Sequence, residues 1–295
     1  MTASPRPVLE AYLSGAISAP VALMRLLLPG ASVAAVSAML ERWAAEAPDG
    51  ASGERLRGLL NLARRHRDGL GLLERVVRAG AAHGGEADPA AAVAASRAMF
   101  DRLVAISPEA SVAAYSLGDP GLLRAATDEL VGWLRCQGLL AGRPAILDLG
   151  CGIGRLAAAL APHAAEVTGL DVSPGMIAAA RQRCDGFGNL RFAVCSGHDL
   201  AGIADMSHDL VLAVDVFPYL VAGGAALAAR HVAEAARVLR HGGSLVILNF
   251  SYRDDAADRR DAAAMAAQAG FSLCRHGTRE LALWDGAAYW LRLAR

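Results

Sequence analysis

The sequence predicts an α/β protein in which an all-helical region precedes a doubly wound, mostly parallel sheet. Three observations support this class. The stretch 145–157, AILDLGCGIGRLA, has the pattern of a buried strand that turns through alternating glycines into a helix. Strand-like and helix-like segments alternate from there to the end of the chain, as they do in parallel sheets. Before residue 107, by contrast, apolar residues recur at helical spacing.

Residues 1–106 are expected to form a helical accessory domain. Ser32 suits the N-cap of a helix over 33–47, in which Val36, Leu40 and Trp43 lie on one face. The helix starts follow one another at irregular intervals, so the region shows no solenoid repeat. Further helix starts are expected at Pro20, at Ser52 ahead of 56–65, at Asp68 and at Asp88-Pro89, where the helix buries Phe100, Leu103 and Val104.

This helical region also contains the one dense basic cluster of the sequence, which comprises Arg55, Arg57, Arg64, Arg65 and Arg67. Two interpretations stay open. The arginines form the solvated face of a helix, or they dock an acidic acceptor such as a carboxylate, a phosphorylated metabolite or a carrier protein.

Residues 107–140 are expected to connect the helical region to a second domain over 141–295. Within this connection, Asp119-Pro120 is a suitable helix start and Gly138 a suitable helix end.

The glycine-rich turn at the start of the second domain predicts a cofactor site. Glycine lets the backbone pass close to a ligand, and the exposed amides of such a turn bind polar groups. The spacing Asp-x-Gly-x-Gly-x-Gly, which begins at Asp148, differs from the dinucleotide fingerprint Gly-x-Gly-x-x-Gly. A carboxylate is unfavourable beside a phosphate and favourable beside a cationic amino group. S-adenosylmethionine carries such an amino group and no phosphate.

The next predicted strand, 166–172, ends on a second acid, Asp171. An acid at the carboxyl end of the neighbouring strand can accept hydrogen bonds from both ribose hydroxyls. Ser173-Pro174 then opens a helix, since serine is a good N-cap and proline suits the first helical position.

The remaining segments continue the alternation of strands and helices. The nearly unbroken apolar run of 209–216 predicts a strand that is covered on both faces. Asp215 interrupts this run at its carboxyl end, where ligands lie in open α/β sheets. Other strands are expected at 190–195, 244–249, 271–283 and 287–293, with helices at 224–239 and 253–269 and a tight reversal at Gly242-Gly243.

In order and spacing, these segments resemble the motifs of the class I S-adenosylmethionine-dependent methyltransferases, over roughly residues 115–295. The resemblance rests on AILDLGCGIGRLA, on DVSPGMIAAAR from Asp171, on SGHDL from Ser196, on DLVLAVDVFPYL and on RVLRHGGSLVILNFS. It implies a Rossmann-like, seven-stranded, mostly parallel sheet closed by an antiparallel hairpin. It also implies S-adenosylmethionine as the cofactor.

The resemblance also implies roles for individual residues. Asp171 would hold the ribose, Met176 would pack near the adenine, and Tyr115 is either a lid contact or a core aromatic residue. The family commonly has an Asp where this chain has Ser196, so that adenine contact is missing here. Together with the strand ends, these arguments assign to the cofactor Tyr115, Asp148, Gly150, Cys151, Gly152, Gly154, Asp171, Val172, Met176, Ser196, Gly197, Asp215 and Phe217.

Candidate catalytic residues are His198, Asp215 and Tyr219, which all lie near the carboxyl edge of the predicted sheet. A His or Asp would help to remove the proton of a hydroxyl acceptor. Alignment of the reactants alone supplies about 7–11 kcal/mol, so a strong base is not always required. The sequence is compatible with an O, N, C or S atom as the methyl acceptor.

The composition of the chain disfavours several classes of binding partner. The 29 acidic residues balance 29 basic ones, all of them Arg, which disfavours nonspecific binding to nucleic acid. The chain also lacks the Asn/Asp-Pro-Pro-Tyr signature of many nucleic-acid amino-methyltransferases. No segment has the length of a membrane span or the pattern of an export signal, and the five cysteines show no metal-type spacing. We therefore expect a cytoplasmic enzyme without a metal.

The favoured function is methyl transfer to a small-molecule acceptor. Alternatives are a protein or carrier-bound acyl acceptor, which the arginine cluster motivates, and a non-catalytic protein that binds S-adenosylmethionine. The glycine spacing disfavours a nicotinamide dehydrogenase. A homodimer through the helical region is a further expectation, by analogy with the family.

Overall fold

The structure is a computed structural model that describes residues 4–47, 49–80 and 88–294. The chain divides into two compact units. Unit 1 comprises residues 1–82, 102–126 and 281–285, and unit 2 comprises residues 83–101, 127–280 and 286–295. Two helices, α6 (Pro89–Ile106) and α8 (Pro120–Cys136), contribute residues to both units.

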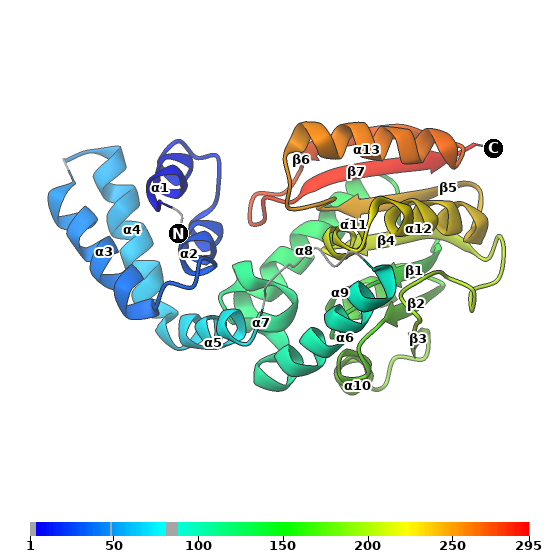
Figure 1. The fold of residues 1–295 in the computed structure, drawn as a ribbon, viewed down its shortest axis with the longest axis horizontal. Helices are drawn as coiled ribbons and strands as arrows, with labels where there is room; N and C mark the ends of the chain where they lie inside the picture. The colour runs from blue at the N-terminus through cyan, green and yellow to red at the C-terminus, as the bar shows by residue number, and fades with distance from the viewer. Residues whose placement is uncertain (1–3, 48, 81–87, 295) are drawn as a thin grey trace. The chain divides into compact units, whose positions relative to one another are not determined.

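Unit 2 contains a seven-stranded sheet with the order β3-β2-β1-β4-β5-β7-β6 (Figure 1). The first five strands are parallel, and β7 pairs antiparallel with both β5 and β6. The predicted class, a mostly parallel sheet with a closing antiparallel hairpin after a helical region, is therefore confirmed. The strands are β1 (Ala145–Leu149), β2 (Glu166–Asp171), β3 (Leu190–Val194), β4 (His208–Val214), β5 (Leu239–Leu248), β6 (Phe271–Arg279) and β7 (Ala287–Leu293).

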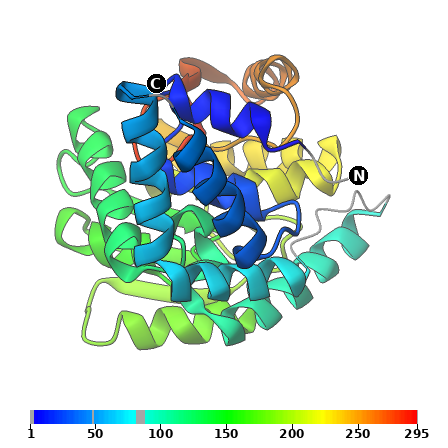
Figure 2. The ribbon, with the colours of Figure 1, turned by 90° about the vertical axis from the view of Figure 1, so that its left-hand side faces the viewer.

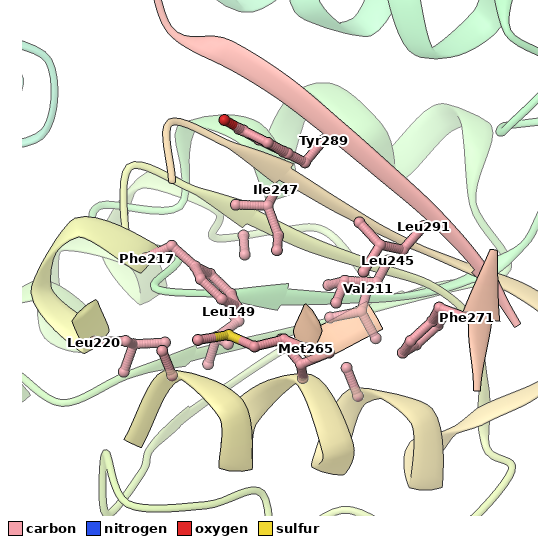
Figure 3. Packing of buried hydrophobic residues seen from close by; sticks show 14 of the residues in the cluster. Leu149, Val211, Phe217, Leu220, Leu245, Ile247, Met265, Phe271, Tyr289 and Leu291 are labelled. Carbon is pink, nitrogen blue, oxygen red and sulfur yellow. The ribbon is translucent and has the colours of Figure 1, made fainter. Parts of the chain in front are cut away.

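Helices cover this sheet because its central strands are apolar on both faces. All five residues of β1 are buried. On one face, Leu149, Val211 and Ile247 share a core with the apolar sides of three helices (Figure 3). The helices that lie wholly within unit 2 are α9 (Arg155–Leu160), η2 (Ala161–His163), α10 (Pro174–Arg183), α11 (Phe217–Ala222), α12 (Ala225–Val238) and α13 (Asp255–Gln268), of which the last three cover this face.

Unit 1 is helical, and its first five helices pack against one another (blue to cyan in Figure 2). Ser32 caps α3 by accepting a hydrogen bond from the Ala35 amide at 3.1 Å. Val36 and Leu40 of this helix are buried. The helices are α1 (Arg6–Leu13), α2 (Ala19–Leu27), α3 (Val33–Glu46), α4 (Ala51–Arg65), α5 (Arg67–Arg78), α7 (Pro108–Val112) and η1 (Ala114–Ser116). No helix of the described residues is long and apolar enough to cross a membrane.

Many predicted element boundaries shift by one or two residues, and three others are described individually. Helix α4 begins at Ala51 rather than after Ser52, because Gly50 takes the N-cap position with φ 119°. Strand β5 begins at Leu239, and the predicted reversal at Gly242-Gly243 is an irregularity in the pairing of β4 with β5. Strand β6 ends at Arg279 rather than at residue 283.

Candidate active site

Two acidic side chains end neighbouring strands at the same edge of the sheet. β1 and β2 are parallel, with Asp148 opposite Gly169 and Leu149 opposite Leu170. Asp148 is the fourth residue of β1, and Asp171 is the last of β2. Their side chains are only 2% and 8% exposed. Because the charge of Asp171 raises the pKa of Asp148, the two carboxylates lie within electrostatic reach of each other.

The turn between β1 and α9 requires its glycines. Gly150, Gly152 and Gly154 all have positive φ, at 70°, 52° and 72°. Amides of Gly150 and Cys151 donate to the Leu170 carbonyl at 2.8 and 2.9 Å, which fixes the turn to the end of β2. A Cβ on Gly150 would lie 2.8 Å from the Val216 Cβ. The turn therefore depends on both the conformation and the small volume of glycine.

A Gly150→Ala substitution is expected to destabilise the protein by about 2–4 kcal/mol, since it adds a clash with Val216 to the strain of positive φ. Gly186→Ala is the matched control, because Gly186 has φ 89° but no atom within 4 Å of an added Cβ. The control should lose about 1–2 kcal/mol. Chemical denaturation measures both values, and equal losses would show that the turn tolerates a side chain.

Asp171 is held by backbone amides on both sides. Its carboxylate accepts from Gly152 N at 2.9 Å and from Ser173 N at 2.9 Å. Burial raises the pKa of Asp171, while these amides act in the opposite direction. Each carboxylate oxygen accepts more than one hydrogen bond, so both retain capacity for a ligand hydroxyl. Asp171 thus links the glycine turn to the start of α10 and faces the same edge.

Asp148 has an oxygen that the described residues leave unsatisfied. Its Oδ2 is buried and has no hydrogen-bond partner among them. Burial raises the pKa of Asp148 to about 7, with Arg155 opposing this rise and Asp171 adding to it. A buried carboxylate oxygen without a hydrogen bond is costly. A cationic group at this position would supply both the missing hydrogen bond and the missing charge.

The other predicted cofactor residues of unit 2 lie in differing surroundings, from the hydrophobic core to an exposed loop. Burial raises the pKa of the Cys151 thiol, which keeps it protonated and inert. Met176 is buried in α10. An added Cβ on Gly197 would lie 2.7 Å from Val172 Cγ1, so those two residues adjoin. Ser196 is exposed, and its hydroxyl accepts from His198 N at 3.1 Å. Phe217 lies in the core (Figure 3). Its ring centroid is 5.6 Å from that of Phe250.

Asp215 forms a strained polar pair with a residue that sequence reasoning missed. Asn249 Nδ2 donates to Asp215 Oδ1 at 2.8 Å. Asp215 and Asn249 follow β4 and β5 and have φ 57° and 69°. Left-handed conformations are tolerated by Asp and Asn but still cluster at functional sites. Asn249 carries no local sequence signal beyond its place at a strand end.

Of the three candidate catalytic residues, two lie close together. Burial raises the pKa of Tyr219, and the charge of Asp215 raises it further. His198 instead acts on His231 of α12, because burial lowers the pKa of His231 and the charge of His198 also lowers it. The structure thus groups Asp215 with Tyr219.

Helix α6 reaches this edge at several points, which no local pattern predicts. Val93 Cγ1 would lie 2.7 Å from a Cβ on Gly197. Asp101 accepts from the Ser173 hydroxyl at 2.5 Å and from Gly175 N at 3.0 Å, at the start of α10. The ring of Phe100 packs edge-to-face against that of Tyr219. The amphipathic spacing predicts only that Phe100 is buried. These contacts all involve the part of α6 that belongs to unit 2.

Tyr115 and the arginine cluster belong to unit 1. Tyr115 is buried and stacks on Trp284, with ring centroids 5.7 Å apart and an interplanar angle of 24°. Arg55 donates to the Tyr12 carbonyl at 2.6 Å, and its guanidinium lies 4.7 Å from the Tyr12 ring centroid. Arg64 pairs with Glu41 at 3.1 Å. Two of the five clustered arginines are therefore already engaged within their own unit.

Comparisons with known proteins agree with this geometry. A family model described as "Methyltransferase domain" matches residues 147–247. Two curated relatives, both named demethylmenaquinone methyltransferase, come from Tropheryma whipplei strains Twist and TW08/27. Each is 34% identical over 158 residues, which cover 53% of this chain and 59% of the relative. The match thus spans about three-fifths of the relatives' length.

A solved structure shows the same fold. Magnesium protoporphyrin IX methyltransferase from Synechocystis PCC 6803, determined with bound S-adenosylmethionine, is 22% identical with a TM-score of 0.51. The likeness covers 69% of this chain and 97% of that one. The matched family model covers the glycine turn, both acidic strand ends and the strands through Ile247. Residues 147–247 therefore match the methyltransferase domain family, and the sheet has the same fold as a structure determined with bound S-adenosylmethionine.

Proposed function

We propose that this protein transfers a methyl group from S-adenosylmethionine to a small-molecule acceptor by direct displacement. The orphaned oxygen of Asp148 carries the proposal, because it is a buried anionic acceptor beside the glycine turn. It matches the ammonium of the methionine part in charge and in hydrogen bonding. A pyrophosphate at the same place would meet two carboxylates, those of Asp148 and Asp171, which is electrostatically unfavourable.

Each residue at this edge of the sheet would bind a different part of the cofactor. Asp148 binds the ammonium, and Asp171 accepts hydrogen bonds from the ribose hydroxyls. Val172 and Gly197 adjoin where the family places the adenine. When bound, the cofactor supplies a sulfonium-activated methyl group, whose bond to sulfur breaks with the electron pair left on sulfur as the bond to the acceptor forms. Helix α6 contacts the start of α10 and the Gly197 loop beside this edge, and close packing there would favour alignment and the exclusion of water.

Several observations favour a small acceptor in the cytoplasm. The formal net charge is zero, which disfavours a nucleic-acid substrate, because such substrates attract proteins with an excess of basic residues. The relatives from Tropheryma whipplei are named for a small-molecule acceptor, demethylmenaquinone. All five cysteines are free thiols, which suits a reducing compartment.

Thermal melting with two ligands tests the choice of cofactor. We expect S-adenosylhomocysteine at 100 times its dissociation constant to stabilise the protein by about 2.7 kcal/mol, and NAD to leave the melting temperature unchanged. Stabilisation by NAD alone would contradict the proposal. Mass spectrometry of cell extract incubated with the protein and isotopically labelled methyl donor then identifies the acceptor as a labelled small molecule. Label found only on protein would support the carrier-bound alternative instead.

A further inference from the structure

Three aromatic side chains from three different elements meet at the ends of β4 and β5. Tyr219 of α11 lies between them, with its ring centroid 5.1 Å from that of Phe100 in α6 and 6.5 Å from that of Tyr252. The interplanar angles are 68° and 90°, so both contacts are edge-to-face. A side-chain hydrogen bond also joins Tyr219 and Tyr252. Only 5% of the chain is aromatic, so this grouping is a local concentration.

Tyr252 presents its ring to solvent although it belongs to this cluster. Its exposed fraction is 54%, and the only other exposed aromatic side chain among the described residues is Phe187, at 41%. Tyr219 and Phe100 are partly buried. A large exposed ring beside a binding edge is a common feature of ligand sites, where aromatic faces provide contact area.

The backbone around Tyr252 is held on both sides. Ser251 donates to the buried Asp258 at 2.5 Å, and Arg253 N donates to Ser251 Oγ at 3.0 Å. The Arg253 guanidinium pairs with Asp261 at 2.7 Å. Asp254 then caps α13 by accepting from Ala257 N at 2.8 Å. The segment that carries the exposed ring is therefore held by its flanking residues, and such preorganisation lowers the entropic cost of binding.

The polar pair of Asp215 and Asn249 borders the same cluster. Burial raises the pKa of Tyr219 and of Tyr252, and the charge of Asp215 raises both pKa values further. Asn249 is three residues before Tyr252 and bonds to Asp215 directly. The cluster thus combines aromatic faces with one polar end, and it adjoins the end of β4 beside the proposed cofactor edge.

We infer that Phe100, Tyr219 and Tyr252 form the acceptor site and that the acceptor is a planar aromatic ring with a polar substituent. The ring packs on the exposed face of Tyr252, and its substituent points to Asp215 and Asn249. Fixed edge-to-face rings favour flat conjugated molecules over flexible aliphatic ones. This inference rests on the proposed function, because it places an acceptor beside S-adenosylmethionine.

The test is a binding titration of the full chain saturated with S-adenosylhomocysteine, using 1-naphthol as the aromatic probe and ethanolamine as the aliphatic one. We expect saturable binding of 1-naphthol and none of ethanolamine. Tyr252→Ala should weaken 1-naphthol binding about tenfold, and Tyr252→Phe, which keeps the ring, less than about threefold. Phe187→Ala is the matched control for loss of an exposed aromatic ring and should bind as the wild type does.

The outcomes separate the two proposals. Failure of S-adenosylhomocysteine to bind the wild type would overturn the proposed function and this inference with it. Normal S-adenosylhomocysteine binding combined with no 1-naphthol binding, or with equal 1-naphthol binding by wild type and Tyr252→Ala, would overturn the aromatic acceptor site alone. Tight ethanolamine binding would do the same. Because Tyr252 is exposed, circular dichroism should show that both variants keep the native fold.

Discussion

Replacing Asp171 with alanine is expected to weaken the binding of S-adenosylhomocysteine at least about 100-fold. Hydrogen bonds to a charged group contribute about 1.5–3 kcal/mol each. The variant would lose the two hydrogen bonds that the ribose hydroxyls donate to Asp171. The variant also leaves the amides of Gly152 and Ser173 without their present acceptor. We therefore expect a loss of stability of about 1–3 kcal/mol for each amide left buried and unsatisfied.

Two further variants separate affinity from stability. Asp171→Asn keeps an oxygen that accepts from one amide, so it should lose less stability than alanine while still losing the charge. Asp185→Ala removes an exposed acid from the loop after α10 and should leave both properties unchanged. Isothermal titration measures the affinity and urea denaturation the stability. Unchanged affinity in Asp171→Ala would mean that the ribose binds elsewhere.

Asp148→Asn is expected to weaken S-adenosylhomocysteine about 10- to 100-fold, since it removes the charge from the group that binds the ammonium. The wild type should also bind more tightly as pH rises. The pKa of Asp148 is about 7 in the free protein, and only the ionised carboxylate attracts a cation. Affinity should rise about tenfold per pH unit below pH 7 and then level off. Titrations between pH 5.5 and 8 test this slope, which Asp148→Asn should abolish.

The same pKa shift predicts how stability depends on pH. Folding raises the pKa of Asp148 from 3.8 to about 7. Between these two pH values, the folded state therefore binds more protons than the unfolded state. The stability that protonated Asp148 contributes is therefore fully present below about pH 4 and lost as pH rises through 7. From pH 5 to pH 8, the wild type should lose about 2–3 kcal/mol relative to Asp148→Asn. A difference that stays constant with pH would show that Asp148 is ionised at pH 5.

Local chemistry explains why much of this edge was predictable from the sequence. Gly150, Gly152 and Gly154 carry their own conformational requirement, because positive φ is costly for other residues. Asp148 and Asp171 interrupt apolar runs at strand ends, and parallel strands bring their carboxyl ends to one edge. In each of these cases the sequence neighbours of a residue suffice to place it.

The contributions of α6 and of the loop after β5 were not predictable in this way. Phe100 and Asp101 reach the edge only because tertiary packing brings α6 there, and their helical spacing indicates no more than a buried face. Asn249 and Tyr252 follow a strand, but nothing adjacent to them shows that they meet Asp215 and Tyr219. The start of β5 was missed for a related reason, since the irregular pairing at Gly242 is decided by the neighbouring strand.

A crystal structure of the protein with S-adenosylhomocysteine tests the central claim most directly. We predict the ammonium within hydrogen-bond distance of Asp148 Oδ2 and the ribose hydroxyls within hydrogen-bond distance of the Asp171 carboxylate. Clear density for the ligand at any other place, with both carboxylates facing protein atoms alone, would contradict the account.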